Sequence, residues 1–414
     1  MFKKNLMAGA IAAAICAPGV VFAQAAPEPA AAPAPAADKP AENAPLSILG
    51  FDLTGYVDVG YTHLSGKGAF NTTPAGTGGG PNRVFDYKRD ALSPHQAALT
   101  LAKQPKEGFG GLLNVTLGRD ADVIAAYDTN PSNGTGCNLA TGQAATGGCK
   151  TDRWDVTQAF AQHATGPVTV MAGKFVTSAG AEVINSTANT NYSRSILFGY
   201  AIPFTHTGAR VSYAVTDTLT LVGGVNQGWD ALKDTNSAKT LELGGTFSPS
   251  KQFSVAAMNH YGKERVGGLV GTGPEGNRNL IDIVATFNAN DNLTFILNYD
   301  YATQENTATV AANGASKSKW EGLAGYVNYQ FNEQWRLSFR AEYFDDHDGY
   351  RTGIVQKWEE ATLTLGYSPL KNLDLRAEVR ADRSNSNVRA FVDANGITAS
   401  NSQNSFGLQA IYKF

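Results

Sequence analysis

The sequence lacks long apolar runs after its first segment, and it has little cysteine and no excess of positive charge. Past residue 23, no stretch of about 18 consecutive apolar residues occurs, which excludes membrane-spanning helices from that part of the chain. Asp and Glu number 36 against 33 Lys and Arg, and this balance argues against nucleic acid as a partner. Cysteine occurs only three times in 414 residues.

Residues 1–23 predict a secretory signal peptide. Two lysines precede a short apolar run, and Ala23 supplies the small residue expected at a cleavage point. A membrane anchor is the alternative, but Pro18 and Gly19 interrupt the run. Residues 24–45 consist almost entirely of Ala, Pro, Glu, Lys and Asp, a composition that buries too little apolar surface to fold and predicts a disordered linker.

Two of the cysteines, Cys137 and Cys149, enclose a segment rich in Gly, Ala, Thr and Asn. Because an exported protein meets an oxidising periplasm, we expect them to form a disulfide that closes this segment. The spacing lacks the His or the second Cys pair of a zinc site, so no metal is predicted there.

From residue 50 onward, polar and apolar residues alternate with the period of a strand that has one apolar face. The polar faces carry too much charge for a packed protein core. One clear example sets Leu373, Leu375, Ala377, Val379 and Ala381 against Asp374, Arg376, Glu378, Arg380 and Asp382.

Such segments predict about 16 strands, each near the length that crosses a bilayer when tilted. They cover residues 51–62, 95–103, 109–119, 153–164, 167–176, 205–215, 218–228, 239–247, 252–262, 279–287, 292–302, 319–331, 334–345, 357–367, 372–382 and 403–414.

The connections between these strands alternate between short turns rich in Asn, Asp, Gly and Pro and longer segments. This alternation is typical of outer-membrane β-barrels, which have short periplasmic turns and long extracellular loops. We therefore expect residues 46–414 to form an all-β, antiparallel transmembrane barrel with an even number of strands. Aromatic residues near strand ends predict two girdles at the membrane interfaces, with Trp229 and Trp320 assigned to the girdle near the long loops.

The last ten residues alternate in the same way and end on Phe414. They resemble the closing strand and assembly signal of bacterial outer-membrane barrels. That resemblance implies the outer membrane as location, with its lipid and lipopolysaccharide and the barrel assembly machinery as partners.

Residues 173–213 carry a more specific signal in the runs Gly173-Lys174-Phe175, Asn191-Tyr192-Ser193-Arg194-Ser195 and Pro203-Phe204-Thr205-His206-Thr207-Gly208. This stretch resembles the OmpL-like β-barrel porins of Gram-negative bacteria, with Ser178 where proline is more usual. The resemblance implies a pore-forming outer-membrane barrel and names no substrate.

The same stretch contains the third long connection, which is too apolar for an exposed loop. We expect it to fold into the lumen and narrow it, with Glu182, Asn191, Tyr192 and Arg194 facing the aqueous path. The alternative is that it packs over the outer rim or at a subunit contact.

Four arginines, Arg336, Arg340, Arg376 and Arg380, lie on the polar faces of two predicted strands separated by one other. One interpretation is a basic wall opposed by acids such as Glu182, Asp52 and Asp58, which orients charged solutes. The alternative is a self-neutralising lattice of interior charges that keeps the wall hydrated and rigid.

No catalytic signature is present. The six histidines have no zinc-ligand spacing, and no Gly-x-Ser-x-Gly elbow occurs, so neither an enzyme nor a cofactor is predicted. Asp345, Asp346 and Asp348 form an acidic cluster at a predicted strand end, where divalent cations shared with lipopolysaccharide and simple solvation are both possible interpretations.

The sequence thus predicts an outer-membrane porin that passes small hydrophilic solutes by passive diffusion, with homo-oligomerisation left open. The alternative is a structural or surface-interaction barrel whose outer loops bind a partner while the lumen is closed.

Overall fold

The structure, a computed structural model, describes most of the predicted barrel region and none of the residues before 46. The predicted signal peptide, the linker, Cys137 and Cys149 lie outside the described residues, so the disulfide stays a prediction. The described ranges are 46–48, 50–64, 83–86, 90–125, 154–234, 236–265, 274–307, 317–352, 355–385, 389–392 and 399–414.

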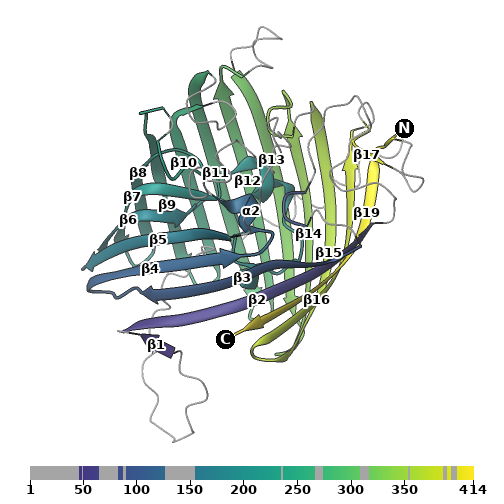
Figure 1. The fold of residues 1–414 in the computed structure, drawn as a ribbon, viewed down its shortest axis with the longest axis horizontal. Coiled ribbons are helices and arrows are strands. Elements are labelled where there is room, and N and C mark those ends of the chain that lie inside the picture. The colour runs from purple at the N-terminus through teal and green to yellow at the C-terminus, as the bar shows by residue number, and fades with distance from the viewer. Residues whose placement is uncertain are drawn as a thin grey trace, which may run out of the picture.

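Within these ranges, 16 antiparallel strands form one closed ring (Figure 1). Strands adjacent in sequence pair with each other, and the pairing of β19 with β2 closes the ring. The strands are β2 (Phe51–Leu64), β3 (Leu92–Lys103), β4 (Gly108–Leu117), β5 (Trp154–Thr165), β6 (Val168–Val176), β7 (Thr205–Thr216), β8 (Leu219–Asn226), β9 (Thr240–Ser250), β10 (Phe253–Arg265), β11 (Glu275–Asn290), β12 (Leu293–Glu305), β13 (Lys317–Gln330), β14 (Trp335–Asp346), β15 (Gln356–Leu370), β16 (Leu373–Ser384) and β19 (Ser402–Lys413).

Short elements accompany the ring. Strand β1 (Leu46–Ile48) pairs with the start of β2, and β17 (Phe391–Val392) pairs with β18 (Ala399–Ser400). The helical turns are α2 (Ala121–Ile124), η3 (Ser186–Ala188) and η4 (Leu197–Ala201). No helix in the described residues is long and apolar enough to cross a membrane.

The predicted fold class is confirmed, and each predicted strand corresponds to an observed one. The strand ends differ by a few residues, most at β11, which was predicted from residue 279 and begins at Glu275. Short and long connections alternate around the ring as predicted. The assignment of the two ends of the barrel to periplasm and exterior remains a prediction.

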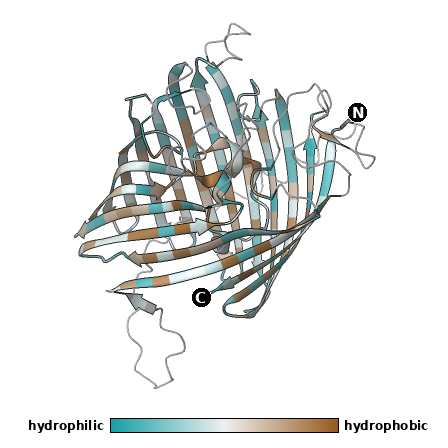
Figure 2. Ribbon diagram, in the orientation of Figure 1, coloured by the Kyte–Doolittle hydropathy of each residue, from teal (hydrophilic) through white to brown (hydrophobic). Residues whose placement is uncertain are grey.

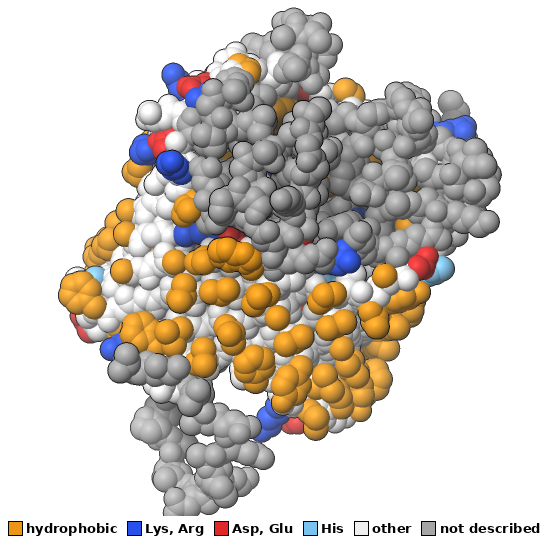
Figure 3. Space-filling view, in the orientation of Figure 1, with side chains coloured by type: hydrophobic (Ala, Val, Ile, Leu, Met, Phe, Trp, Pro, Cys, Tyr) orange, Lys and Arg blue, Asp and Glu red, His pale blue; other side chains and the backbone are white. Residues whose placement is uncertain are grey.

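The two faces of each strand have different side chains, as the alternating colours of Figure 2 show. Apolar side chains on the outward face are exposed to the surroundings, as with Leu243, Val379 and Leu408. In Figure 3 they gather in a band on the near wall, over β2 to β5. The inward positions of β14 to β16 are mostly polar and buried, which is the arrangement of a barrel with lipid outside and polar contents inside.

Two aromatic girdle assignments were wrong. Trp320 lies on the inward face of β13 and is completely buried, and Trp229 is also buried in the interior. Their position near a strand end could not show which face they occupy, because a tryptophan near a loop can lie against lipid or against a segment folded into the barrel. By contrast, Trp154 and Tyr261, which also lie near long connections, are exposed on the outward face.

The C-terminal residue is fixed where the ring closes. The backbone N–H of Gly55 donates to the Phe414 carbonyl oxygen at 2.8 Å, and the Phe414 N–H donates back at 2.9 Å. The ring of Phe414 lies over Gly55, where an added Cβ would stand 2.6 Å from Cζ. A glycine is therefore needed on β2 for the terminal aromatic residue to lie flat.

We expect Gly55→Val to lower the unfolding free energy by about 1–3 kcal/mol, because the added atoms force Phe414 and the neighbouring strand apart. The temperature at which heat-modifiable electrophoretic migration is lost would report the change. Gly223→Val is the matched control, since a Cβ at that outward glycine of β8 meets only Leu243 Cδ2 at 3.9 Å. An equal loss of stability in both variants would contradict the requirement for a glycine beside the Phe414 ring.

Candidate functional site

A loop between β6 and β7, residues 177–204, lies inside the barrel. Its central residues bond to β14–β16, which lie about half-way around the ring from β6 and β7. The backbone N–H groups of Tyr192 and Ser193 donate to Glu378 on β16, at 2.7 Å to Oε2 and 3.1 Å to Oε1. The loop therefore spans the lumen, and we name it the inward loop.

The wall that receives the inward loop is a regular array on β14, β15 and β16. Strand pairing aligns their inward residues into rows, and basic rows alternate with hydroxyl and acidic rows. From the short turns toward the long loops, the rows are Arg336–Gly366–Arg376, Ser338–Thr364–Glu378, Arg340–Thr362–Arg380 and Glu342–Glu360–Asp382. We call these rows the charged wall.

The carboxylates of the charged wall bind pairs of consecutive backbone N–H groups. Glu378 binds Tyr192 and Ser193, and Glu342 binds Ile196 N at 2.7 Å and Leu197 N at 3.1 Å. A carboxylate has two acceptor oxygens, so each one can satisfy two donors that no neighbouring strand reaches.

The arginines of the charged wall bind backbone carbonyl oxygens of the same loop. Arg340 Nη1 donates to Ser193 O at 2.7 Å, and Arg380 Nη1 donates to Arg194 O at 2.7 Å. Arg376 Nη1 donates to Asn191 O at 3.1 Å, and its Nη2 donates to Ser186 O at 3.2 Å. Donors and acceptors of the loop backbone are thus both provided by charged side chains.

Ion pairs hold the arginines in place. Arg340 lies 2.7 Å from Glu182 and 2.8 Å from Glu360, and the side chain of Arg340 has no exposed surface. Glu182 also accepts the N–H of Ser195 at 2.7 Å. Arg380 is 2.6 Å from Asp382. The contacts are those of the self-neutralising lattice, with the added role of binding a loop.

The interpretation of Glu182 as an acid that opposes the basic wall across the channel is wrong, because the inward loop carries it into contact with Arg340. Asp58 is buried and accepts two hydrogen bonds from Gln409 Nε2, at 2.8 and 2.9 Å. Asp52 is exposed at the start of β2 and has no part in the array.

Tyr192 fits between β2, β3 and β19. Its hydroxyl lies 2.9 Å from Thr62 Oγ1 and 3.0 Å from His95 Nε2. A Cβ at Gly60 or Gly407 would stand 2.5 Å from the tyrosine, so both glycines leave space for it. Burial, followed by the carboxylate of Asp86, raises the pKa of Tyr192 well above its ordinary value and keeps the hydroxyl protonated.

Asn191 and Arg194 also make contacts within the barrel. Asn191 Nδ2 donates to Thr364 Oγ1 at 2.7 Å, and Arg194 donates to the carbonyl oxygens of Val183 and Ile184 at 3.1 and 2.9 Å. Asn191, Tyr192 and Arg194 are each at most 5% exposed. These contacts fix the inward loop in this structure. The three side chains are buried, whereas the sequence predicted that they face the aqueous path.

Residues 83–86 form a second inward segment that sequence reasoning missed. Arg83 bonds Ser405 Oγ at 2.5 Å and Asp382 at 3.2 Å. The ring of Phe85 stacks on Phe198 of the inward loop, with centroids 5.7 Å apart. The available signal was Val84 and Phe85, an apolar pair within a connection otherwise rich in Gly, Thr and Asn.

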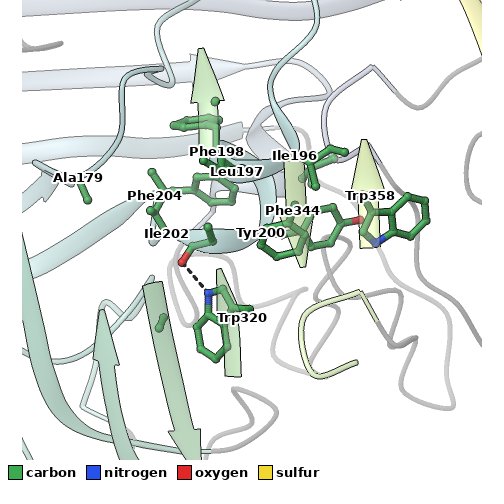
Figure 4. Packing of buried hydrophobic residues seen from close by; sticks show 14 of the residues in the cluster. Ala179, Ile196, Leu197, Phe198, Tyr200, Ile202, Phe204, Trp320, Phe344 and Trp358 are labelled. Carbon is green, nitrogen blue, oxygen red and sulfur yellow. Dashed lines mark hydrogen bonds between the residues drawn. The ribbon is translucent and has the colours of Figure 1, made fainter. Parts of the chain in front are cut away.

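An apolar cluster packs around η4 on the long-loop side of the charged wall (Figure 4). Trp320 Nε1 donates to Ala201 O at 3.0 Å. Cations also pack on the tryptophans, with Arg278 Cζ 4.7 Å from the Trp229 ring centroid. The buried side chains labelled in the view are those of Ala179, Ile196, Leu197, Phe198, Tyr200, Ile202, Phe204, Trp320, Phe344 and Trp358.

Two acids of the cluster at the end of β14, Asp345 and Asp346, have partners within the chain. Asp345 pairs with Lys357 at 2.6 Å, and Asp346 accepts the N–H groups of Arg351 and Thr352. No group of three or more metal-ligating side chains occurs among the described residues.

Comparison with known proteins gives one family and several similar folds. The family described as "Putative beta-barrel porin-2, OmpL-like" matches residues 50–414. The outer membrane channel DcaP of Acinetobacter baumannii has a TM-score of 0.57 and 15% identity, covering 90% of this chain and 100% of that chain. OmpT of Vibrio cholerae, in a trimer form, has a TM-score of 0.56 and 12% identity, covering 88% and 99%. The anion-selective porin from Comamonas acidovorans has a TM-score of 0.54 and 11% identity, covering 88% of this chain and 99% of that chain. At these identities the likeness shows the fold alone, and no curated protein matches the sequence.

We expect Arg340→Met to lower the unfolding free energy by about 3–5 kcal/mol, because Glu182 and Glu360 lose the cation that compensates their burial. Urea unfolding in lipid vesicles, followed by tryptophan fluorescence, measures the change. Arg383→Met is the control, since Arg383 is exposed on β16 and should change stability by no more than about 0.5 kcal/mol. An Arg340 variant as stable as this control would contradict the anchoring role.

Proposed function

The chain belongs to the OmpL-like β-barrel porins of the bacterial outer membrane, and we propose that it forms a channel through which small hydrophilic solutes diffuse passively. The proposal includes no catalytic step, cofactor or coupling to an energy source. The inward loop would set the width of the route.

The observation that carries this proposal is the inward loop fixed across a ring of 16 strands. A barrel of this size is wider than its own side chains can fill, so it leaves room for water. A loop bound to the opposite wall reduces that room where it crosses the lumen. Narrowing of a channel limits solutes by size and by the charge of the lining groups.

The side chains at the short-turn end of the barrel favour a water-filled entrance there. The inward positions of β7 and β8 there are small or neutral: Ser212, Thr220 and Val222 are half-buried, and Ala214 is exposed. None of these side chains is tied to the charged wall by a hydrogen bond in the described residues. We propose that this end faces the periplasm and that the long loops face the exterior.

Partners follow from the location. We propose that the closing strand with Phe414 is the segment read by the barrel assembly machinery, and that the outward apolar band contacts outer-membrane lipid, with lipopolysaccharide at the long-loop end. One similar structure, OmpT of Vibrio cholerae, is described in a trimer form. A homo-oligomer is our proposal for this chain as well.

The second candidate is a structural or interaction barrel with a closed lumen. The apolar cluster around η4 favours it, because Leu197, Tyr200 and Trp320 are nearly or fully buried inside the barrel. The two candidates differ in a measurable property, since only a channel conducts ions.

We expect the refolded protein to give stable single-channel steps in a planar bilayer. Deleting residues 184–199 should raise the conductance about twofold or more, because the deletion removes the segment that narrows the lumen. A deletion of residues 236–238 in the β8–β9 connection is the control, since Asn236 bonds to Asp234, Ala238 and the Lys263 carbonyl oxygen of β10 and not to the inward loop. A folded wild type without steps would favour the closed barrel, and unchanged conductance in the first deletion would reject the inward loop as the constriction.

A further inference from the structure

Arg336 differs from every other arginine on the inward faces of the described strands. Arg210, Arg278, Arg340, Arg376 and Arg380 are buried. Arg336 lies at the end of the charged wall nearest the short turns, and 17% of its side chain is exposed. Exposure of an inward cation places it against the space inside the barrel.

The guanidinium of Arg336 has donors to spare. Its Nη2 donates to Asp374 Oδ2 at 2.8 Å. Its Nε and Nη1 make no hydrogen bond to any described residue, and neither is a buried atom without a partner. Nη2 carries a second N–H, and together with the N–H of Nε or of Nη1 beside it this group forms a fork that matches the two oxygens of a carboxylate or a phosphate.

The local charge favours an anion. Arg336 and Arg376 share one carboxylate oxygen, since the Nη2 atoms of both lie 2.8 Å from Asp374 Oδ2. Asp374 can neutralise only one of them. The next acid, Asp58, is bound by Gln409 on the far side of Arg376, and Glu378 is bound to the inward loop. Asp374 therefore compensates the charge of Arg336 only in part.

The position of the guanidinium is fixed in advance. Arg336 lies directly over Gly366 of β15, where an added Cβ would be 2.5 Å from Cζ and 2.7 Å from Nε. A guanidinium held in place on the inward face is suited to a small oxyanion.

We propose that Arg336 is an anion-binding station on the permeation route, reached from the short-turn end, and that it receives the carboxylate or phosphate group of small anionic solutes. This inference rests on the proposed channel function. Small anionic solutes would bind at Arg336 as they pass through the channel. Arg336, and not the buried arginines of the charged wall, would determine the selectivity.

The test measures binding and conduction separately. Saturation-transfer NMR on the detergent-solubilised barrel reports binding of propionate, and binding of inorganic phosphate is measured by its competition with propionate. Arg336→Gln should abolish the propionate signal, while Arg336→Lys should bind about tenfold more weakly, because it keeps the charge and loses the fork. Gly366→Ala should weaken binding as well, since its Cβ displaces the guanidinium. Arg383→Gln, on the outward face of β16, is the control and should bind like the wild type.

Conduction is then measured in planar bilayers with a potassium chloride gradient. Propionate or phosphate added at the short-turn side should reduce the chloride current of the wild type, and Arg336→Gln should abolish this block and shift the reversal potential toward cations. Propionate binding that is equal in wild type and Arg336→Gln overturns the inference even where the channel conducts. Binding that depends on Arg336 in a barrel that never conducts supports the station and rejects the proposed channel. If phosphate competes with propionate, the site at Arg336 accepts oxyanions in general. If phosphate does not compete, the site is restricted to carboxylates.

Discussion

The structure depends on hydrogen-bond partners for the backbone of the inward loop. This loop lies inside the barrel, and no strand runs beside it to supply them. A buried peptide group without a partner is costly, and the inward loop has no regular secondary structure except two short turns. The charged wall supplies the missing partners. Glu378 and Glu342 each accept two N–H groups, and Arg340, Arg376 and Arg380 donate to carbonyl oxygens.

This constraint explains the composition of the inward faces. The side chains between the two arginine strands are Gly366, Thr362 and Thr364, which are small enough for guanidinium groups to extend over β15. Glycines at Gly60 and Gly407 leave space for Tyr192 in the same way. The interior is thereby divided between an apolar cluster on the long-loop side and a more open, neutral surface near the short turns. Arg336 lies at the edge of the charged wall nearest the short turns.

The charged wall also shows how far sequence patterns lead. Alternation placed Arg336, Arg340, Arg376 and Arg380 on inward faces correctly, because the period of a strand fixes the side on which each residue lies. It did not identify their partners. Glu182 binds Arg340 from 158 positions away in sequence, and the inward segment around Phe85 comes from a different connection. Neither contact has a local signal beyond unusual apolar content.

The sequence by itself determined the strands, their order, the outward apolar band and the closure on the last strand, because each of these follows from a period of two residues and from the length of the next connection. Only the tertiary structure decided which loop residues meet which wall residues, why Trp229 and Trp320 are buried, and which arginine keeps free donors. Those outcomes depend on the shape of the space enclosed by the ring and on competition among many charged groups within it. Both exist only once the ring is closed.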